Sequence, residues 1–238
     1  MAWLLAAATQ ASAERVVVHE CNFNDGIPAE YATYDVDGQT PHFTMVQIGF
    51  DQGVAWTTMR ERTNKDNRYA ASTSKHKVVD GTTLNAEDWL VTPLMRIPSA
   101  DATLAWRAQS VCESSQQGDT YEVYVSTTGN RPEDFVGGRL TSISGELVNQ
   151  WAAHEVSLGA YAGKDVYIAF VNRSFQCEVL AIDDVSITSS PGFCEVVEED
   201  YSYSFGTENV QPFGVLLSHS EAPITSFTAY CEVGDKVL

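Results

Sequence analysis

The stretch AIDDVSI, residues 181–187, places two adjacent carboxylates, Asp183 and Asp184, inside a run that is otherwise typical of an apolar strand. Neighbouring side chains on a strand point to opposite faces of the sheet, so one of these carboxylates should face the interior. A lone buried carboxylate is costly unless something positive meets it. The sequence therefore predicts a compensating group at this point of the fold.

Short runs of β-forming residues recur along the whole chain, and helical periodicity is nearly absent. In TYEVYVSTT, residues 120–128, the alternation puts Tyr121, Val123 and Val125 on one face, which we expect to point inward. Many short strands with turn residues between them are typical of a β-sandwich or jelly roll. The expected strands lie in residues 15–23, 42–50, 88–97, 102–110, 120–128, 151–158, 165–173 and 179–188.

The length of 238 residues allows one large all-β domain and part of a second. Residues 1–13, MAWLLAAATQASA, resemble the apolar region of a secretory signal with cleavage after Ala13. We expect a jelly-roll domain at residues 14–190, which ends at a Ser-Pro-Gly cluster followed by an acidic run. Residues 191–238 are then the start of a second β domain. No stretch after residue 13 is predicted to span a membrane.

The charge balance limits the partners that the chain can bind. Fourteen Lys and Arg against 32 Asp and Glu give a formal net charge of −18. Such acidity argues against binding to nucleic acid or to an anionic bilayer, and it suits an exported protein or one that binds hard cations.

Five cysteines contain no CxxC spacing, which argues against a zinc site built from them. Two pairings, Cys112–Cys177 and Cys21–Cys194, and the alternative of buried thiols all remain open.

Several segments in order resemble the cleaved-adhesin family, also known as choice-of-anchor J domains, and more distantly the MAM domains. The match extends from about residue 16 to residue 188 and rests on CNFNDGIP, YDVDG, EDWLVTPLMRI, YEVYVSTTGNRPEDF, HEVSLGAYAGKDVYIAFVN and LAIDDVSI. The resemblance implies a jelly-roll sandwich of a bacterial surface protein, as in the haemagglutinin regions of gingipain-type proteases. It also implies a role in recognition and adhesion.

The resemblance further implies a structural calcium ion where the first and last strands lie side by side. Calcium is bound by carboxylate, amide and carbonyl oxygens. The predicted ligands are Asn24, Asp25, Asp35, Asp37, Asp183 and Asp184. Family members often carry Glu where this chain has Asn24, which reduces the charge of the site. The alternative is that one aspartate accepts hydrogen bonds from backbone amides at a turn while the other is solvated.

Three aromatic residues are candidates for ligand binding. Trp56 and Tyr69 lie in the polar, arginine-rich stretch 51–72, which could form a loop surface that stacks on a sugar or holds a protein partner. Alternatively, Trp56 closes the end of the sandwich. Tyr124 lies on the outward face of its strand and is a further candidate for stacking on a glycan. The tryptophans within strand-like runs are expected in the core: Trp89, Trp106 and Trp151.

The sequence gives little support for a catalytic function. The five histidines show no HExxH or other metal-ligand spacing, and GxSxG and a Gly-rich phosphate loop are absent. We expect a noncatalytic extracellular module that binds a host protein or cell-surface glycan and works beside other domains of the same polypeptide. The alternatives are a carbohydrate-binding module of a larger secreted enzyme and an architectural spacer without its own ligand.

Overall fold

A computed structural model of the chain describes residues 15–112 and 118–190, together with the backbone of four short strands beyond them. These strands form two antiparallel pairs, β13 (Cys194–Val197) with β14 (Val215–Ser218), and β15 (Glu232–Val233) with β16 (Lys236–Val237). The expected signal sequence lies outside the described residues, as does most of the expected second domain, so both stay predictions. The helices within residues 15–112 and 118–190 are all too short to span a lipid bilayer.

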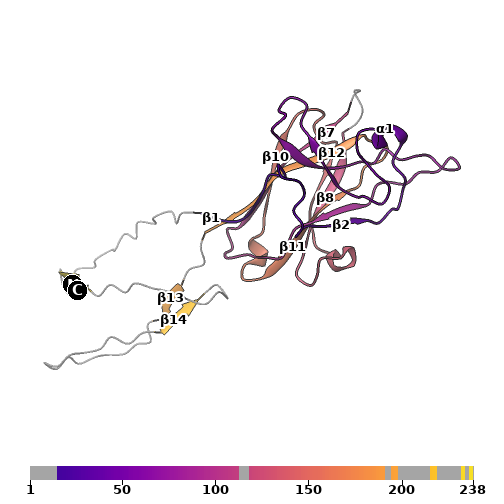
Figure 1. Ribbon diagram of the computed structural model, residues 1–238. Helices are drawn as coiled ribbons and strands as arrows, with labels where there is room; N and C mark the ends of the chain where they lie inside the picture. Colours follow the sequence, from indigo (N-terminus) through magenta and orange to yellow (C-terminus); the bar gives the residue numbers. More distant parts are fainter. Residues whose placement is uncertain are drawn as a thin grey trace.

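The first sheet has β12 at its centre and is antiparallel throughout (Figure 1). Its strand order is β10 (Ala152–Ser157), β7 (Thr103–Val111), β12 (Val179–Ser189), β4 (Arg68–Ser72) and β3 (Thr57–Arg60), and β1 (Val16–Cys21) also pairs with β12. The first and last strands of the domain are therefore neighbours, as the family resemblance implies.

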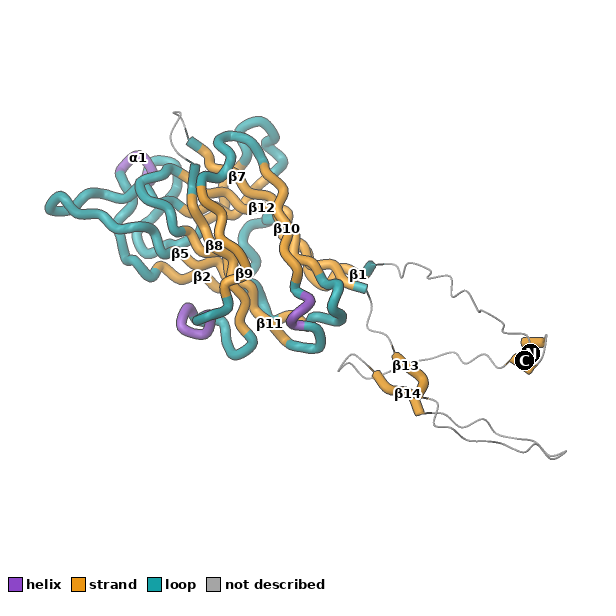
Figure 2. The backbone as a smooth tube through the Cα atoms, turned by 180° about the vertical axis from the view of Figure 1, so that it is seen from behind, coloured by secondary structure: helices purple, strands orange, loops and turns teal. Residues whose placement is uncertain are grey.

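The second sheet packs face to face with the first (Figure 2). Its strand order is β2 (Ala32–Asp35), β5 (Asp88–Val91), β11 (Asp165–Asn172), β8 (Thr120–Ser126) and β9 (Arg139–Ser144), with β6 (Met95–Arg96) also paired to β11. Short helical turns occur at α1 (Phe43–Val46), η1 (Pro132–Phe135) and η2 (Gly159–Tyr161). This arrangement confirms the predicted all-β jelly-roll sandwich.

The core lies between the two sheets and follows the period-two alternation of the strands. Tyr121, Val123 and Val125 point into it from β8, as the sequence predicts. Trp106 on β7 donates a hydrogen bond from Nε1 to the hydroxyl of Tyr121 at 3.0 Å. The polar groups of these two buried rings are therefore paired with each other. Leu180 on β12 is fully buried in the same cluster.

Three regions differ from the sequence-based expectations. The predicted strand at residues 42–50 is wrong, because the His42 ring accepts a hydrogen bond from the amide of Thr44 and starts the short helix α1. The polar stretch 51–72, expected as a loop, forms the hairpin of β3 and β4, in which Thr57 to Arg60 pair with Arg68 to Ala71. The predicted strand at residues 88–97 is interrupted between β5 and β6 at Pro93, which cannot donate to a ladder.

Two of the expected disulfide partners, Cys112 and Cys177, lie close to each other. Cys112 follows β7, and Cys177 precedes β12, which pairs with β7. Burial raises the pKa of the Cys177 thiol to about 11, and the nearby Cys112 adds to this effect. The side chain of Cys194 lies outside the described residues. Both disulfides stay predictions.

Replacing Leu180 with alanine should lower the free energy of unfolding of the full chain by about 3 kcal/mol, because it leaves a cavity between the sheets. Leu94→Ala is the matched control, since Leu94 is 53% exposed and should change stability by at most about 0.5 kcal/mol. Urea titration followed by tryptophan fluorescence measures both values. Equal effects of the two substitutions would contradict this placement of the core.

Candidate functional site

Asp183 and Asp184 occupy a β-bulge in the middle of β12. The register with β7 shifts between Asp183 and Ser186, and Asp184 adopts the left-handed conformation with φ at 47°. A bulge adds one residue to a strand and disturbs the alternation of its faces. Asp183 is thereby fully buried, whereas the side chain of Asp184 is 47% exposed.

The positive group that the sequence requires here is an arginine on the neighbouring strand. Arg107 of β7 pairs directly with Asp183 in register. Its Nη2 lies 2.6 Å from Oδ2 of Asp184 and 3.6 Å from Oδ2 of Asp183. Asn67 donates a hydrogen bond to Asp183 at 2.9 Å. Burial raises the pKa of Asp183 to about 6, and Asn67 and Arg107 oppose that rise.

Asn24, another predicted ligand, lies at the same end of the hairpin as Asp183. Its side-chain oxygen accepts a hydrogen bond from the amide of Arg68 at 2.8 Å, next to Asn67 in the chain. Asp25 follows in an exposed position. Asn24 therefore caps the start of β4, and the carboxylates near it are compensated by Arg107.

Asp35 and Asp37 lie elsewhere, Asp35 as the last residue of β2 and Asp37 in the turn after it. Asp35 accepts a hydrogen bond from the amide of Gly38 at 2.7 Å, and Asp37 accepts from the amides of Gln39 and Glu87 at 2.8 and 2.6 Å. Both aspartates of the DVDG segment thus accept backbone hydrogen bonds, whereas the alternative to a cation site had one of the two aspartates solvated. These bonds leave lone pairs on the carboxylates unused.

The six predicted ligands are divided between the two ends of β4. Asn67, which contacts Asp183, precedes β4, whereas Ser72 at the other end of β4 donates to Asp88, the neighbour of Asp37. The rise along these residues is about 16 Å. One ion cannot bridge that distance, so the structure does not bring the six residues into one site.

A second acidic group gathers around His76, which the sequence-based prediction missed together with Asp88. One ligand atom each of Asp37, His76 and Asp88 lies within 4.8 Å of the others. His76 and Asp88 are 4% and 5% exposed. Burial raises the pKa of Asp88 to about 8, and Asp37 adds to this rise. Asp88 could have been found by the signal that singled out Asp183 and Asp184, which is a carboxylate within an apolar strand.

The donors of this second group fit the predicted calcium ion only in part. The carboxylates of Asp37 and Asp88 are oxygen ligands of the kind that calcium takes. The imidazole of His76 is a ligand that transition metals prefer. Calcium binding by Asp35 and Asp37 therefore stays a prediction, and His76 at the centre of the group argues for a different ion.

The prediction of Trp56 as an exposed ligand-binding residue is wrong. Its ring is 3% exposed and belongs to the core between the sheets. Its Nε1 donates to the backbone carbonyl of Asp88 at 3.1 Å. The residue precedes β3 and closes one end of the sandwich, which was the alternative interpretation.

Tyr124 lies on the outer face of the second sheet, as the alternation in β8 predicts. Its ring packs against Trp89 at 5.5 Å between centroids, and its hydroxyl donates to Glu122 at 2.6 Å. Tyr34 and Tyr167 are partly buried in the same cluster. We call these three tyrosines the outer tyrosine patch. The ring of Trp89 lies beneath it and is only 4% exposed.

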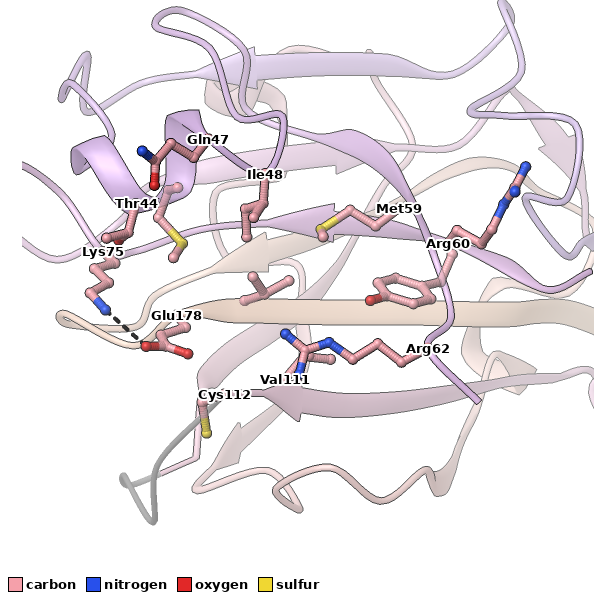
Figure 3. A pocket seen from close by; sticks show the side chains of 13 residues that line it. Thr44, Gln47, Ile48, Met59, Arg60, Arg62, Lys75, Val111, Cys112 and Glu178 are labelled. Atoms are coloured by element: carbon pink, nitrogen blue, oxygen red, sulfur yellow. Dashed lines mark hydrogen bonds and ion pairs between the residues drawn. The ribbon is translucent and has the colours of Figure 1, made fainter. Parts of the chain in front are cut away.

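Tyr69 contributes to a cavity of about 360 Å³ on the outer face of the first sheet, which we call the α1 cavity (Figure 3). Residues of α1 and the following turn face residues of β3, β7 and β12 across it. Its apolar lining comes from Met45, Ile48, Met59, Tyr69, Val111 and Val179. Tyr69 itself is 2% exposed and packs edge-on against Trp151 at 5.6 Å.

Polar groups of both charges surround this apolar lining. Lys75 and Glu178 form an ion pair at 2.8 Å on one side of the cavity. Arg62 extends across it toward Val111, whereas Arg60 points away in Figure 3. A concave, largely apolar surface with a few converging polar groups is typical of small-ligand sites. Segment 42–50 forms one wall of the cavity. Because we expected a strand there, sequence analysis did not predict the cavity.

A family model described as the Cleaved Adhesin Domain matches residues 16–187 of the chain. Lys-gingipain W83 of Porphyromonas gingivalis is 26% identical over 216 residues, which cover 84% of this chain and 11% of that protein. Hemagglutinin A of Porphyromonas gingivalis (strain ATCC BAA-308 / W83) is 30% identical over 148 residues, which cover 53% of this chain and 6% of that protein. The chain thus spans only a small part of these relatives.

Solved structures show the same fold. The K3 cleaved adhesin domain of Lys-gingipain from the same organism superimposes with a TM-score of 0.54 at 24% identity, covering 73% of this chain and all of that domain. The K1 domain gives a TM-score of 0.51 at 22% identity, covering 73% and 97%.

Arg107→Gln should lower the free energy of unfolding by about 2 kcal/mol, because it leaves Asp183 buried without a cation. The double substitution Arg107→Gln with Asp183→Asn should recover at least half of this loss, since the uncompensated charge is gone. Asp184→Asn, which removes only the exposed partner, should cost less than about 1 kcal/mol. Urea unfolding at pH 7 measures all three. An Arg107→Gln variant as stable as the wild type would contradict the assigned role of Arg107.

Proposed function

The chain belongs to the Cleaved Adhesin Domain family, and we propose that its β-sandwich is a noncatalytic recognition module that binds a glycan in the α1 cavity. The observation that carries this proposal is the cavity itself, which is concave, about 360 Å³ in volume and lined by both apolar and charged side chains. Its volume falls within the range of about 300–1,000 Å³ that is usual for ligand pockets.

The chemistry of the lining suits a sugar. A sugar presents apolar C–H faces and a rim of hydroxyl groups, and it needs both kinds of contact. Met45, Ile48 and Met59 offer apolar surface. Thr44, Gln47, Lys75, Arg62 and Glu178 offer donors and acceptors around it. Charged and amide groups at fixed positions give such a site its specificity.

The setting of this activity is part of the same proposal. The module would act outside the cell and bind a host cell-surface glycan or the glycan of a host protein. It would work beside other domains of a longer polypeptide, since the chain spans only 11% of Lys-gingipain W83. The net charge of −18 is consistent with an exported protein and disfavours nucleic acid as a partner.

The outer tyrosine patch supports a second candidate, a carbohydrate-binding module that stacks a sugar on the opposite face of the sandwich. Tyr34, Tyr124 and Tyr167 are each partly exposed there. A tyrosine ring offers a broad apolar face beside a polar tip, which suits the apolar C–H face and the hydroxyl groups of a sugar. The α1 cavity is favoured because it is a defined concavity with converging polar groups.

Ile48→Trp should abolish glycan binding or weaken it at least tenfold, because the larger side chain fills the cavity. Val46→Trp is the matched control, since Val46 and Ile48 are both 47% exposed but only Ile48 lines the cavity. Binding of the purified chain and both variants to a glycan array, followed by titration calorimetry of the hits, measures the effect.

Tyr124→Ala completes the comparison and should leave binding unchanged. Loss of binding in Tyr124→Ala with retention in Ile48→Trp would transfer the site to the outer tyrosine patch. If the folded wild type binds no glycan on the array, the proposal is wrong and the spacer alternative gains weight.

A further inference from the structure

The acidic group around His76 differs from the one around Asp183 in the positive charge that lies beside it. Asp183 has Arg107 beside it. In the cavity where Asp37, His76 and Asp88 meet, the described lining residues include the four aspartates 35, 37, 51 and 88 and no lysine or arginine. Buried or half-buried carboxylates without a cation are costly. Backbone amides donate to Asp35 and Asp37, and Ser72 donates to Asp88, but no described cationic side chain lines this cavity beside the carboxylates.

His76 supplies an independent observation. Its side chain is almost fully buried, with 4% exposed, and its Nδ1 has no hydrogen-bond partner among the described residues. A buried polar atom without a partner costs about 1–3 kcal/mol. One of its ring nitrogens lies within 4.8 Å of carboxylate oxygens of both Asp37 and Asp88. The ring therefore stands beside the carboxylates with an unsatisfied nitrogen.

We propose that Asp37, His76 and Asp88 bind a divalent transition-metal ion of the zinc class. Zinc is held by imidazole nitrogen and carboxylate oxygen at about 2.0–2.2 Å, which places neighbouring ligand atoms roughly 3.5 Å apart in a tetrahedral site. Ligand atoms that already lie within 4.8 Å of one another need only small movements to reach this geometry. Asp35 and Asp51, which line the same cavity, add negative charge around the ion.

The choice of zinc over calcium follows from the donor set. Calcium takes six to eight oxygen ligands, and an imidazole occupies a position that it cannot use. Two carboxylates and one imidazole make a small, mixed set that fits a four-coordinate ion with one water. The free volume of about 10 Å³ leaves room for one small ion or water and for nothing larger.

The position of the site gives the metal a structural consequence. His76 forms a β-bridge with Pro41, just before α1, and Asp51, Gly53 and Val54 at the other end of that loop line the same cavity. The ion would therefore hold both ends of the segment that forms one wall of the α1 cavity. This metal site does not depend on whether the α1 cavity binds a glycan.

The test is calorimetric titration of the chelator-treated full chain with ZnCl₂, MnCl₂ and CaCl₂. Zinc should bind one site at least tenfold more tightly than calcium. His76→Gln should weaken zinc binding at least 100-fold and leave the response to calcium unchanged. His42→Gln is the matched control, because His42 contacts Thr44 rather than the acidic group and should bind zinc like the wild type. Calcium binding as tight as that of zinc, or zinc binding unaffected by His76→Gln, would overturn the proposal.

A measurement on the wild type decides the case if His76→Gln does not fold. In protein labelled with ¹⁵N-histidine, one equivalent of zinc should shift the ring nitrogens of a single imidazole among the five. Zinc that binds without shifting any imidazole, or that shifts several to the same extent, would show binding to surface carboxylates or scattered histidines and would also overturn the proposal.

Discussion

The first sheet depends on the contact between Arg107 and the two aspartates in β12. β12 pairs with β7 along one side, and along the other it pairs first with β4, at Leu180 to Ile182, and then with β1 from Val185 onward. The bulge at Asp183 and Asp184 lies where the partner changes. Because Asp183 is buried there, its charge must be compensated, which Asn67 does by a hydrogen bond and Arg107, opposite in register, by its positive charge. The same strand carries Val179 to the floor of the α1 cavity, so the contact also positions the proposed site.

Much of the fold could be predicted from the sequence because the strands obey a simple alternation. The run from Tyr121 to Val125 is buried at every second position, as expected. The prediction failed at Phe43–Val46, where an apolar run forms α1 and covers the outer face of the first sheet. It also failed at β3 and β4, whose turn is rich in charged residues. Polarity alone does not distinguish an exposed hairpin from a loop.

The site was predicted in part. The reasoning that two carboxylates in a strand need a positive partner was sound, but the partner is an arginine from another strand, which no local pattern reveals. Tyr69 and Trp56 are both buried rather than on a loop surface, but Tyr69 lines the proposed cavity on the outer face of the first sheet, whereas Trp56 packs in the core between the sheets. His76 and Asp88 were not predicted because they are distant from Asp37 in the sequence. Asp37 lies in a turn, His76 in a loop and Asp88 at the start of β5, and only the fold brings the three together.

The most direct test of the central claim uses the methyl groups of the methionines, labelled with ¹³C and observed by NMR while free oligosaccharides are added. Met45 and Met59 line the α1 cavity, and Met95 lies in the core between the sheets as an internal reference. Binding in the cavity predicts that the resonances of Met45 and Met59 shift together and saturate with the same dissociation constant, while that of Met95 stays in place. An oligosaccharide that binds the protein without moving Met45 or Met59 would contradict the assignment of the cavity as the ligand site.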